Sequence, residues 1–195
     1  RPQLLDRLSI CVDVGGIKDE NMRAEIIKRN MQFSDDPEGF YGKYKEKQEA
    51  LREKIKYARQ IIKKVIVPEH IVYLIARLCS SLEVDGHRPD IVIAQTARAL
   101  AALDGRMEVN ADDVRLASFL ALVHRTRNGG LLEPPSLSEI EEKFLKALKD
   151  VKTKFKIKIE VKKKRSSDYM ESILKHPVVV DKAQKISLKG REFFR

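Results

Sequence analysis

The sequence is poor in cysteine and contains no tryptophan. Its two cysteines, Cys11 and Cys79, each lie among apolar residues, and neither belongs to a Cys-X-X-Cys pair. A small secreted domain held by disulfides is therefore disfavoured, and we interpret both thiols as reduced core residues of an intracellular protein. No apolar run approaches the roughly 20 residues that a membrane-spanning helix needs, and no signal peptide is recognisable. The expected location is the cytoplasm.

The motifs of most catalytic sites are also absent. No Gly-rich loop ending in Gly-Lys-Ser/Thr is present to hold a triphosphate, and no apolar strand ends in the paired acids that bind magnesium. No His-Glu-X-X-His motif or Cys/His cluster points to a metal. The four histidines are scattered, which favours ordinary structural roles: His70, His87, His124 and His176. We therefore expect the chain alone to bind no metal or cofactor and to catalyse no reaction.

Positive charge is concentrated at one end of the sequence. Residues 1–150 hold 25 Lys and Arg against 24 Asp and Glu, whereas residues 151–195 hold 14 against 5. A basic segment of this kind attracts nucleic acid, an acidic protein segment or an anionic membrane surface. The alternative is that its lysines only protect an exposed strand edge from aggregation. The sequence leaves both interpretations open.

Apolar residues recur at helical spacing through most of the chain, which predicts a mainly α-helical fold. Capping residues mark where several helices begin, among them Asp19, Asn110 and Ser136. The helix capped by Asn110 is expected to end at His124, where basic residues suit the negative end of the helix dipole. The expected helices cover residues 1–8, 19–33, 38–64, 69–82, 88–103, 111–124 and 136–150.

Two segments alternate in the manner of strands. Residues 9–14 are rich in β-branched side chains and end at a glycine pair, which predicts a strand. Residues 152–161 place apolar side chains such as Phe155 on one side and lysines such as Lys154 on the other, which predicts a half-exposed strand. Residues 128–135, with two glycines and two prolines, are expected to form a linker.

Two arginines stand out by their positions. Arg7 ends the first expected helix, directly before the strand, where it can project from the surface and meet a phosphate held by another subunit. The alternative is an ordinary helix-terminal arginine that pairs with Asp6 or Asp13.

The second arginine, Arg88, lies in the first turn of an expected helix, where the helix dipole disfavours a cation. An arginine at this point reaches over a bound nucleotide if the helix forms a lid. The alternative is an ion pair with Asp85 or Asp90.

The sequence around both arginines resembles the motor subunit of magnesium chelatases, an AAA+ ATPase. The segment RPQLLDRL, followed by the strand-like CVDV, is similar to the segment that carries the arginine finger in that family. The triplet GHR that ends at Arg88 matches the Gly-X-Arg element at the start of a lid helix, and TARALAAL matches the helix that follows. The resemblance covers about residues 1–127 and is weakest over residues 38–64.

This resemblance implies a helical AAA+ lid bundle as the fold. A short helix-strand remnant of the core domain would occupy residues 1–16, and the lid would occupy residues 17–127. A linker and helix at residues 128–150 would lead to a small basic α/β tail at residues 151–195, which matches nothing in the family. The chain is thus interpreted as the C-terminal part of an ATPase, without its nucleotide-binding core.

The resemblance also implies roles and partners. Arg7 would be the arginine finger, acting in trans on the nucleotide of a neighbouring subunit, with Asp6 beside it to orient it. Arg88 would be the sensor-2 arginine. The parent protein would bind ATP and Mg²⁺ and form a homo-oligomeric ring, usually a hexamer. It would work with a subunit that carries a von Willebrand A domain, and with a larger catalytic subunit, to insert a metal ion.

Two other functions fit parts of the sequence. One is the lid of a MoxR-like AAA+ chaperone, which differs from a chelatase motor only in its client. The other is a basic helical module that binds nucleic acid through residues 151–195, for which binding would weaken steeply with added salt. The sequence does not distinguish insertion of a metal into a tetrapyrrole from remodelling of another protein.

Overall fold

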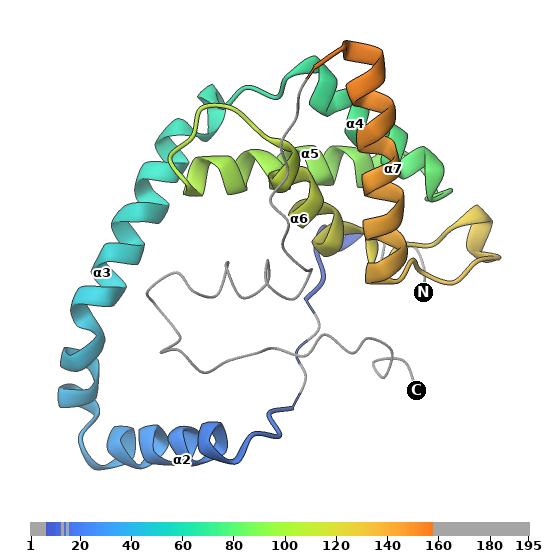
Figure 1. The fold of residues 1–195 in the computed structure, drawn as a ribbon. Coiled ribbons are helices and arrows are strands. Elements are labelled where there is room, and N and C mark those ends of the chain that lie inside the picture. Colours follow the sequence, from blue (N-terminus) through green and yellow to red (C-terminus); the bar gives the residue numbers. More distant parts are fainter. Residues whose placement is uncertain (1–6, 13, 15, 158–195) are drawn as a thin grey trace. The chain divides into compact units, whose positions relative to one another are not determined.

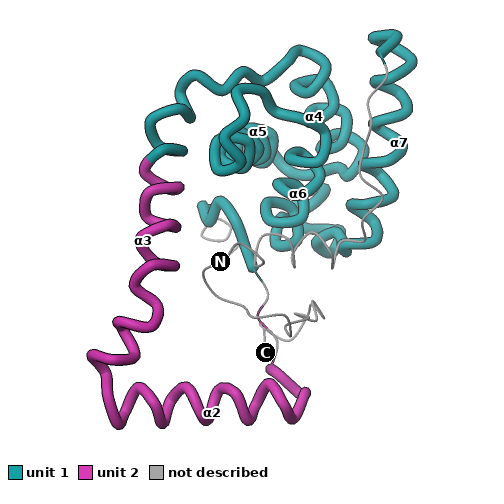
Figure 2. The backbone as a smooth tube through the Cα atoms, turned by 60° about the vertical axis from the view of Figure 1, so that its left-hand side comes forward, with its two compact units in different colours: residues 1–12, 57–166 teal, residues 13–56, 167–195 magenta. Residues whose placement is uncertain are grey.

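The computed structural model describes residues 7–12, 14 and 16–157. These residues contain six α-helices and no sheet, so the prediction of a mainly α-helical fold is confirmed. The chain divides into two compact units, one of residues 1–12 and 57–166 and the other of residues 13–56 and 167–195 (Figure 2). No helix among the described residues is long and apolar enough to cross a membrane.

The second unit consists, in its described part, of α2 (Glu20–Asp35) and α3 (Pro37–Ile61) up to residue 56. Both helices begin at a capping aspartate. The Oδ1 atom of Asp19 accepts a hydrogen bond from the Met22 amide at 2.8 Å, and that of Asp36 accepts one from the Gly39 amide at 2.9 Å. Side-chain capping of this kind satisfies amides that have no partner inside the helix, which is why both helices start where they do.

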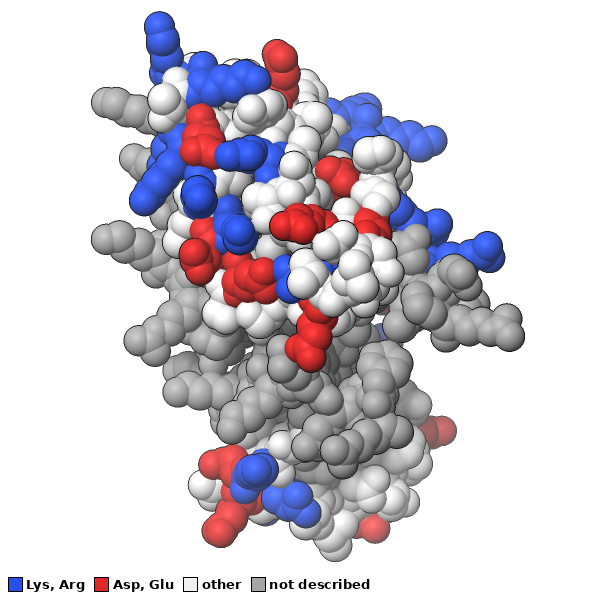
Figure 3. All heavy atoms as spheres, turned by 90° about the vertical axis from the view of Figure 1, so that its right-hand side faces the viewer, with Lys and Arg blue, Asp and Glu red and all other residues white. Residues whose placement is uncertain are grey.

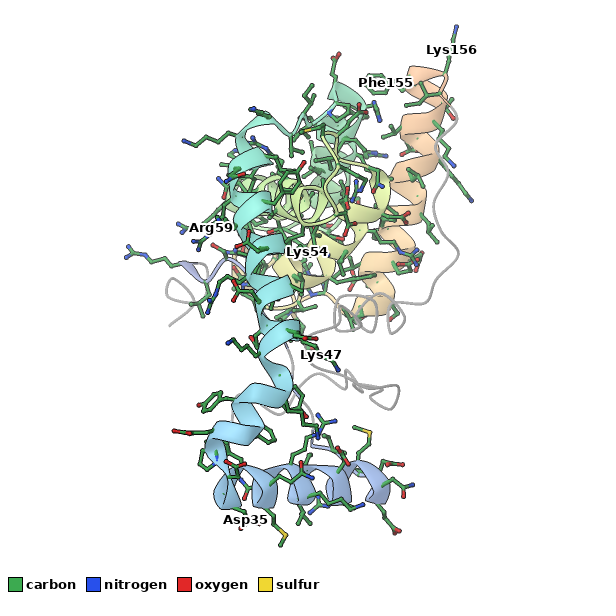
Figure 4. The ribbon with its side chains drawn as sticks, turned by 90° about the vertical axis from the view of Figure 1, so that its left-hand side faces the viewer. Asp35, Lys47, Lys54, Arg59, Phe155 and Lys156 are labelled. Carbon is green, nitrogen blue, oxygen red and sulfur yellow. The ribbon has the colours of Figure 1, made fainter. Side chains whose placement is uncertain are left out.

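The exposed surface of α3 is densely charged. Lys47 and Lys54 lie along its length (Figure 4). Neighbouring acids and bases form ion pairs three residues apart, Arg52 with Glu49 at 3.0 Å and Lys56 with Glu53 at 3.3 Å. Exposed pairs of this kind add only a few tenths of a kcal/mol each, so their effect is mainly to keep this surface solvated.

The first unit is a bundle of four helices: α4 (Glu69–Ser81), α5 (Arg88–Leu103), α6 (Ala111–Leu122) and α7 (Leu137–Phe155), shown in Figure 1. Helix α6 is its centre, since every residue of this helix except Asp112 is buried. Helices α5 and α7 both pack on α6, and α4 packs on α7 and α5. A helix that is apolar on almost all sides requires neighbours on almost all sides, so α6 determines where the others lie.

The polar groups of α6 are satisfied at its start and along its outer edge. Asn110 and Asp113 form the predicted cap as a reciprocal capping box, and Arg106 donates to both carboxylate oxygens of Asp113, at 2.8 and 2.5 Å. Further along, the buried guanidinium of Arg115 pairs with Glu141 of α7, with its Nε at 2.7 Å from Oε2. Buried charges are tolerated only when they are paired in this way.

The predicted strand at residues 152–161 is wrong for the part that the structure describes. Helix α7 continues to Phe155, because Val151 and Phe155 extend its apolar stripe by one further turn. The Phe155 ring packs edge-on against the Tyr73 ring, with 5.8 Å between the ring centres, and the Nζ of Lys154 lies 3.6 Å from the centre of the Tyr73 ring. Figure 4 shows Phe155 and Lys156 at the end of α7. Residues 158–161 lie outside the described part.

The predicted strand at residues 9–14 is also wrong for its described residues, which are neither strand nor helix. A strand needs a neighbouring strand to complete its hydrogen bonds. Here the Cys11 amide donates instead to the carbonyl of Leu120, at 2.8 Å, near the end of α6. Of the first expected helix only Arg7 and Leu8 are described, and Arg7 is helical.

The third correction concerns the end of α6. The helix stops at Leu122 rather than at His124, so the two basic residues that follow, His124 and Arg125, lie beyond the helix. The Ser136 cap is confirmed, since its hydroxyl accepts from the Glu139 amide at 3.2 Å. The Glu139 carboxylate accepts from Arg127 at 2.6 Å.

The packing of the bundle predicts how substitutions at two adjacent residues of α7 change its stability. Phe144 is fully buried against the core, whereas the Leu145 side chain is 43 % exposed. Phe144→Ala is expected to lower the free energy of unfolding by about 3–5 kcal/mol, because it leaves a cavity. Leu145→Ala, the matched control, is expected to cost about 0.5 kcal/mol. Urea unfolding followed by circular dichroism measures both, and equal costs would contradict the packing described here.

Candidate functional site

Arg88 is the first residue of α5 and is exposed. It follows Gly86, whose φ of +69° lies in the left-handed region that side chains disfavour. His87 occupies the N-cap position without a side-chain capping bond. The first amides of α5 are therefore not capped by the preceding side chain, and Arg88 adds a positive charge at the positive end of the helix dipole.

The turn before Arg88 is braced by residues 126–129. The Asp85 amide donates to the Thr126 carbonyl at 3.2 Å, and the Asn128 amide donates to the Glu83 carbonyl at 3.2 Å. The carboxylate of Asp85 in turn accepts from the Gly129 amide at 2.8 Å. These bonds run in both directions across the turn, so the start of α5 is fixed in place.

The alternative interpretation of Arg88, an ion pair with Asp85 or Asp90, is wrong within the described residues, where neither carboxylate pairs with it. Asp85 accepts from Gly129, as above. Burial raises the pKa of Asp90, which accepts a hydrogen bond from the Cys79 thiol, and burial also raises the pKa of that thiol. Arg88 thus keeps its guanidinium available while both nearby acids have other partners.

Arg7 is exposed, and its own backbone is helical. Its two alternative partners, Asp6 and Asp13, lie outside the described residues, and so does any orienting role of Asp6. The residue after Arg7 is held firmly: the Leu8 carbonyl accepts from His124 Nε2 at 2.9 Å and from Arg125 at 3.1 Å. Because a carbonyl only accepts, His124 must carry its proton on Nε2.

Arg125 is among the most buried side chains of the chain, with 1 % of its surface exposed. Its Nε donates to the Ala121 carbonyl at 3.1 Å, and a terminal nitrogen donates to the Leu8 carbonyl at 3.1 Å and toward that of Ser9 at 3.5 Å. A guanidinium removed from water needs acceptors for its protons, and backbone carbonyls supply them here. Arg125 therefore ties the end of α6 to the residues that follow Arg7.

One short segment, residues 124–129, thus contacts the backbone beside both candidate arginines. Its first two residues bind Leu8, next to Arg7, and three of the other four, Thr126, Asn128 and Gly129, bind the turn that precedes Arg88. We call it the connector segment. The sequence did not reveal this role, because the basic residues after α6 had a sufficient local explanation in the helix dipole.

Within the part of the chain that the structure describes, neither arginine lies in a cluster of metal ligands. The described residues contain no group of three or more His, Cys, Asp or Glu that is able to hold a metal ion. On the face drawn in Figure 3, acidic and basic side chains of the described residues are interspersed, so this face carries no continuous basic field. An exposed guanidinium at a helix N-terminus fits a phosphate oxygen, but the described residues offer no loop to enclose a triphosphate.

Comparison with known proteins identifies the bundle. Residues 72–144 match the family described as the AAA lid domain. The chain is 44 % identical over 139 residues to the magnesium-chelatase subunit ChlI homolog of Methanocaldococcus jannaschii, covering 71 % of this chain and 38 % of that protein. It is 41 % identical over 144 residues to magnesium-chelatase subunit ChlI of Cyanophora paradoxa, covering 74 % of this chain and 42 % of that protein.

A third relative, the chloroplastic magnesium-chelatase subunit ChlI-2 of Arabidopsis thaliana, is 39 % identical over 144 residues, which cover 74 % of this chain and 34 % of that protein. The chain spans less than half the length of each of these relatives. The helical bundle, the matched lid and these identities together show that the chain belongs to the magnesium-chelatase ChlI family of AAA+ proteins, of which it carries the lid.

Proposed function

We propose that this chain supplies two arginines to ATP hydrolysis in a ring of AAA+ subunits. Arg88 acts on the nucleotide of its own subunit, as sensor 2, and Arg7 acts in trans on the nucleotide of the neighbouring subunit. The observation that carries the proposal is the exposed Arg88, which has no carboxylate partner among the described residues and stands on a braced turn at the start of a lid helix.

The chemistry of Arg88 supports this role. A guanidinium and the positive end of a helix dipole both attract negatively charged oxygen, so together they favour a phosphate over any neutral ligand. The bracing bonds at Asp85 prevent the turn from relaxing when no phosphate is present. Preorganised positive charge of this kind lowers the barrier to phosphoryl transfer, because it needs no rearrangement as charge develops.

Arg7 is proposed to assist ATP hydrolysis in the neighbouring subunit. It is exposed, and the backbone that follows it is fixed on the lid. In a ring built from one repeated heterologous contact, an arginine on the contact surface of one subunit is able to reach a nucleotide bound at the same contact by the next subunit. An arginine supplied in this way neutralises charge on the transferred phosphoryl group.

The wider setting is part of the proposal. ATP and Mg²⁺ bind to the nucleotide-binding core, which this sequence does not contain, and the ring is a hexamer that works with a von Willebrand A-domain subunit and a larger catalytic subunit to insert a metal. The cytoplasmic location stays a prediction. So does the division of the chain into residues 1–16, 17–127, 128–150 and 151–195. An acidic or nucleic-acid partner for the basic tail also stays a prediction, since residues 158–195 lie outside the described part.

We propose the client of a chelatase rather than that of a MoxR-like chaperone, because the similar proteins are magnesium-chelatase subunits or a homolog of one. The nucleic-acid module stays a prediction, because it rests on residues 151–195, most of which lie outside the described part.

The first prediction concerns Arg88. In the AAA+ protein that carries this sequence together with its core, Arg88→Ala is expected to lower kcat for ATP hydrolysis by about 10²-fold or more, because a preorganised charge is lost. Binding of a fluorescent ATP analogue should stay measurable. Gln95→Ala, at an exposed position of the same helix, is the control and should leave kcat unchanged. Normal turnover by the Arg88 variant would remove this residue from the site.

The second prediction concerns Arg7. Arg7→Ala is expected to lower kcat by about 10³-fold, as the loss of an arginine finger does. It should leave the KM for ATP nearly unchanged, since the residue does not hold the nucleotide of its own subunit. Ring assembly, measured by analytical ultracentrifugation, serves as the control. A large rise in KM with an unchanged kcat would show that Arg7 binds substrate rather than stabilising the transition state.

A further inference from the structure

We propose that Arg125 is a positioning residue for Arg7. Arg125 attaches the backbone just after Arg7 to the connector segment. It thereby fixes the position of Arg7 relative to the turn that precedes Arg88. This inference rests on the function proposed above and adds to it a residue that touches neither nucleotide.

The segment after Arg7 has little else to hold it in place. Leu8, Ile10 and Val12 expose 58, 50 and 50 % of their surfaces, so burial of their side chains does not fix the segment. Hydrogen bonds do so instead. The Leu8 carbonyl accepts from Arg125 and His124, and the Cys11 amide donates to the Leu120 carbonyl at 2.8 Å. The described residues from 8 to 11 are thus attached to the end of α6 near both of their ends.

Arg125 is the firmest of these attachments. Its guanidinium is fully buried and binds carbonyls from two places in the chain, Ala121 on α6 and Leu8 beside Arg7. If the Leu8 carbonyl moved away, a proton of a buried cation would lose its acceptor, which is costly where water cannot replace it. The planar guanidinium also fixes the direction of both bonds, which a flexible ammonium group does not.

The consequence for Arg7 follows from the chain geometry. Consecutive Cα atoms lie about 3.8 Å apart, so a fixed Leu8 leaves the Arg7 backbone little room to move. The connector segment continues from Arg125 directly to residues 126–129, which brace Glu83 and Asp85 before Arg88. A displacement of the lid turn by nucleotide is therefore transmitted to the backbone beside Arg7 through one short run of residues.

The test uses the full-length protein in its ring and measures steady-state ATP hydrolysis. Arg125→Gln removes the buried guanidinium group. This change is expected to lower kcat by about 10- to 100-fold, as small displacements of a catalytic group do. The KM for ATP should change less than twofold. In the double variant with Arg7→Ala, Arg125→Gln should lower kcat no further, because the Arg7 side chain that Arg125 positions is already removed.

Two further variants separate positioning from general instability. Arg115→Gln breaks a different buried arginine contact, the ion pair of Arg115 on α6 with Glu141, so it should lower the melting temperature by a similar amount while leaving kcat within twofold. Arg125→Lys keeps the buried charge but carries its donors on a single nitrogen, and should recover part of the lost kcat. If Arg125→Gln does not assemble, Arg125→Lys is measured alone and must still lower kcat more than Arg115→Gln does.

These measurements distinguish failure of the proposed function from failure of the positioning role of Arg125. If Arg7→Ala itself leaves turnover normal, the proposed function is wrong. If Arg7→Ala abolishes turnover while the Arg125 variants lower kcat no more than Arg115→Gln, only the positioning role is wrong. Equal and additive losses from Arg125→Gln in the presence and absence of Arg7 would also overturn the inference, since they show that Arg125 acts by another route.

Discussion

The burial of α6 over nearly its whole length is the constraint on which the rest of the lid depends. A helix with one partly exposed residue, Asp112, must be covered by neighbours on all sides, and α5 and α7 supply that cover. The same burial leaves no room for unpaired charge, which is why Arg115 pairs with Glu141 and why Arg125, just past the end of the helix, turns to backbone carbonyls. Packing thereby determines where the polar contacts beside the candidate site form.

The connector segment links this packing to the two arginines of the proposed function. Arg7 and Arg88 are 81 positions apart in the chain, and each by itself is an ordinary exposed arginine. What relates them is that the residues after α6 bond to Leu8 on one side and to the turn at Asp85 on the other. In a ring, this would couple the nucleotide that a subunit senses to the arginine that it offers to its neighbour. Mechanical coupling of this kind requires a contiguous set of contacts, which these hydrogen bonds supply.

The sequence predicted the helices well because their signals are local. Caps such as Asn110 and Ser136 fixed helix starts, and the triplet ending at Arg88 marked the lid helix. The two predicted strands failed because alternation does not reveal whether a partner strand exists: the Cys11 amide bonds to α6 instead, and Phe155 follows the helical stripe of α7. The Arg125 contact was not predictable, since its acceptor is a backbone carbonyl 117 positions away, and carbonyls leave no trace in a sequence.

The most direct test of the central claim, that the two arginines act on nucleotides in different subunits, is to mix two inactive proteins. Full-length Arg7→Ala subunits keep an intact nucleotide site, and full-length Arg88→Ala subunits keep an intact arginine finger. When the two are assembled into mixed rings and ATP hydrolysis is measured, turnover is expected to reappear, because some interfaces then pair an intact site with an intact finger. Mixed rings that form but stay as inactive as each variant alone would contradict the account.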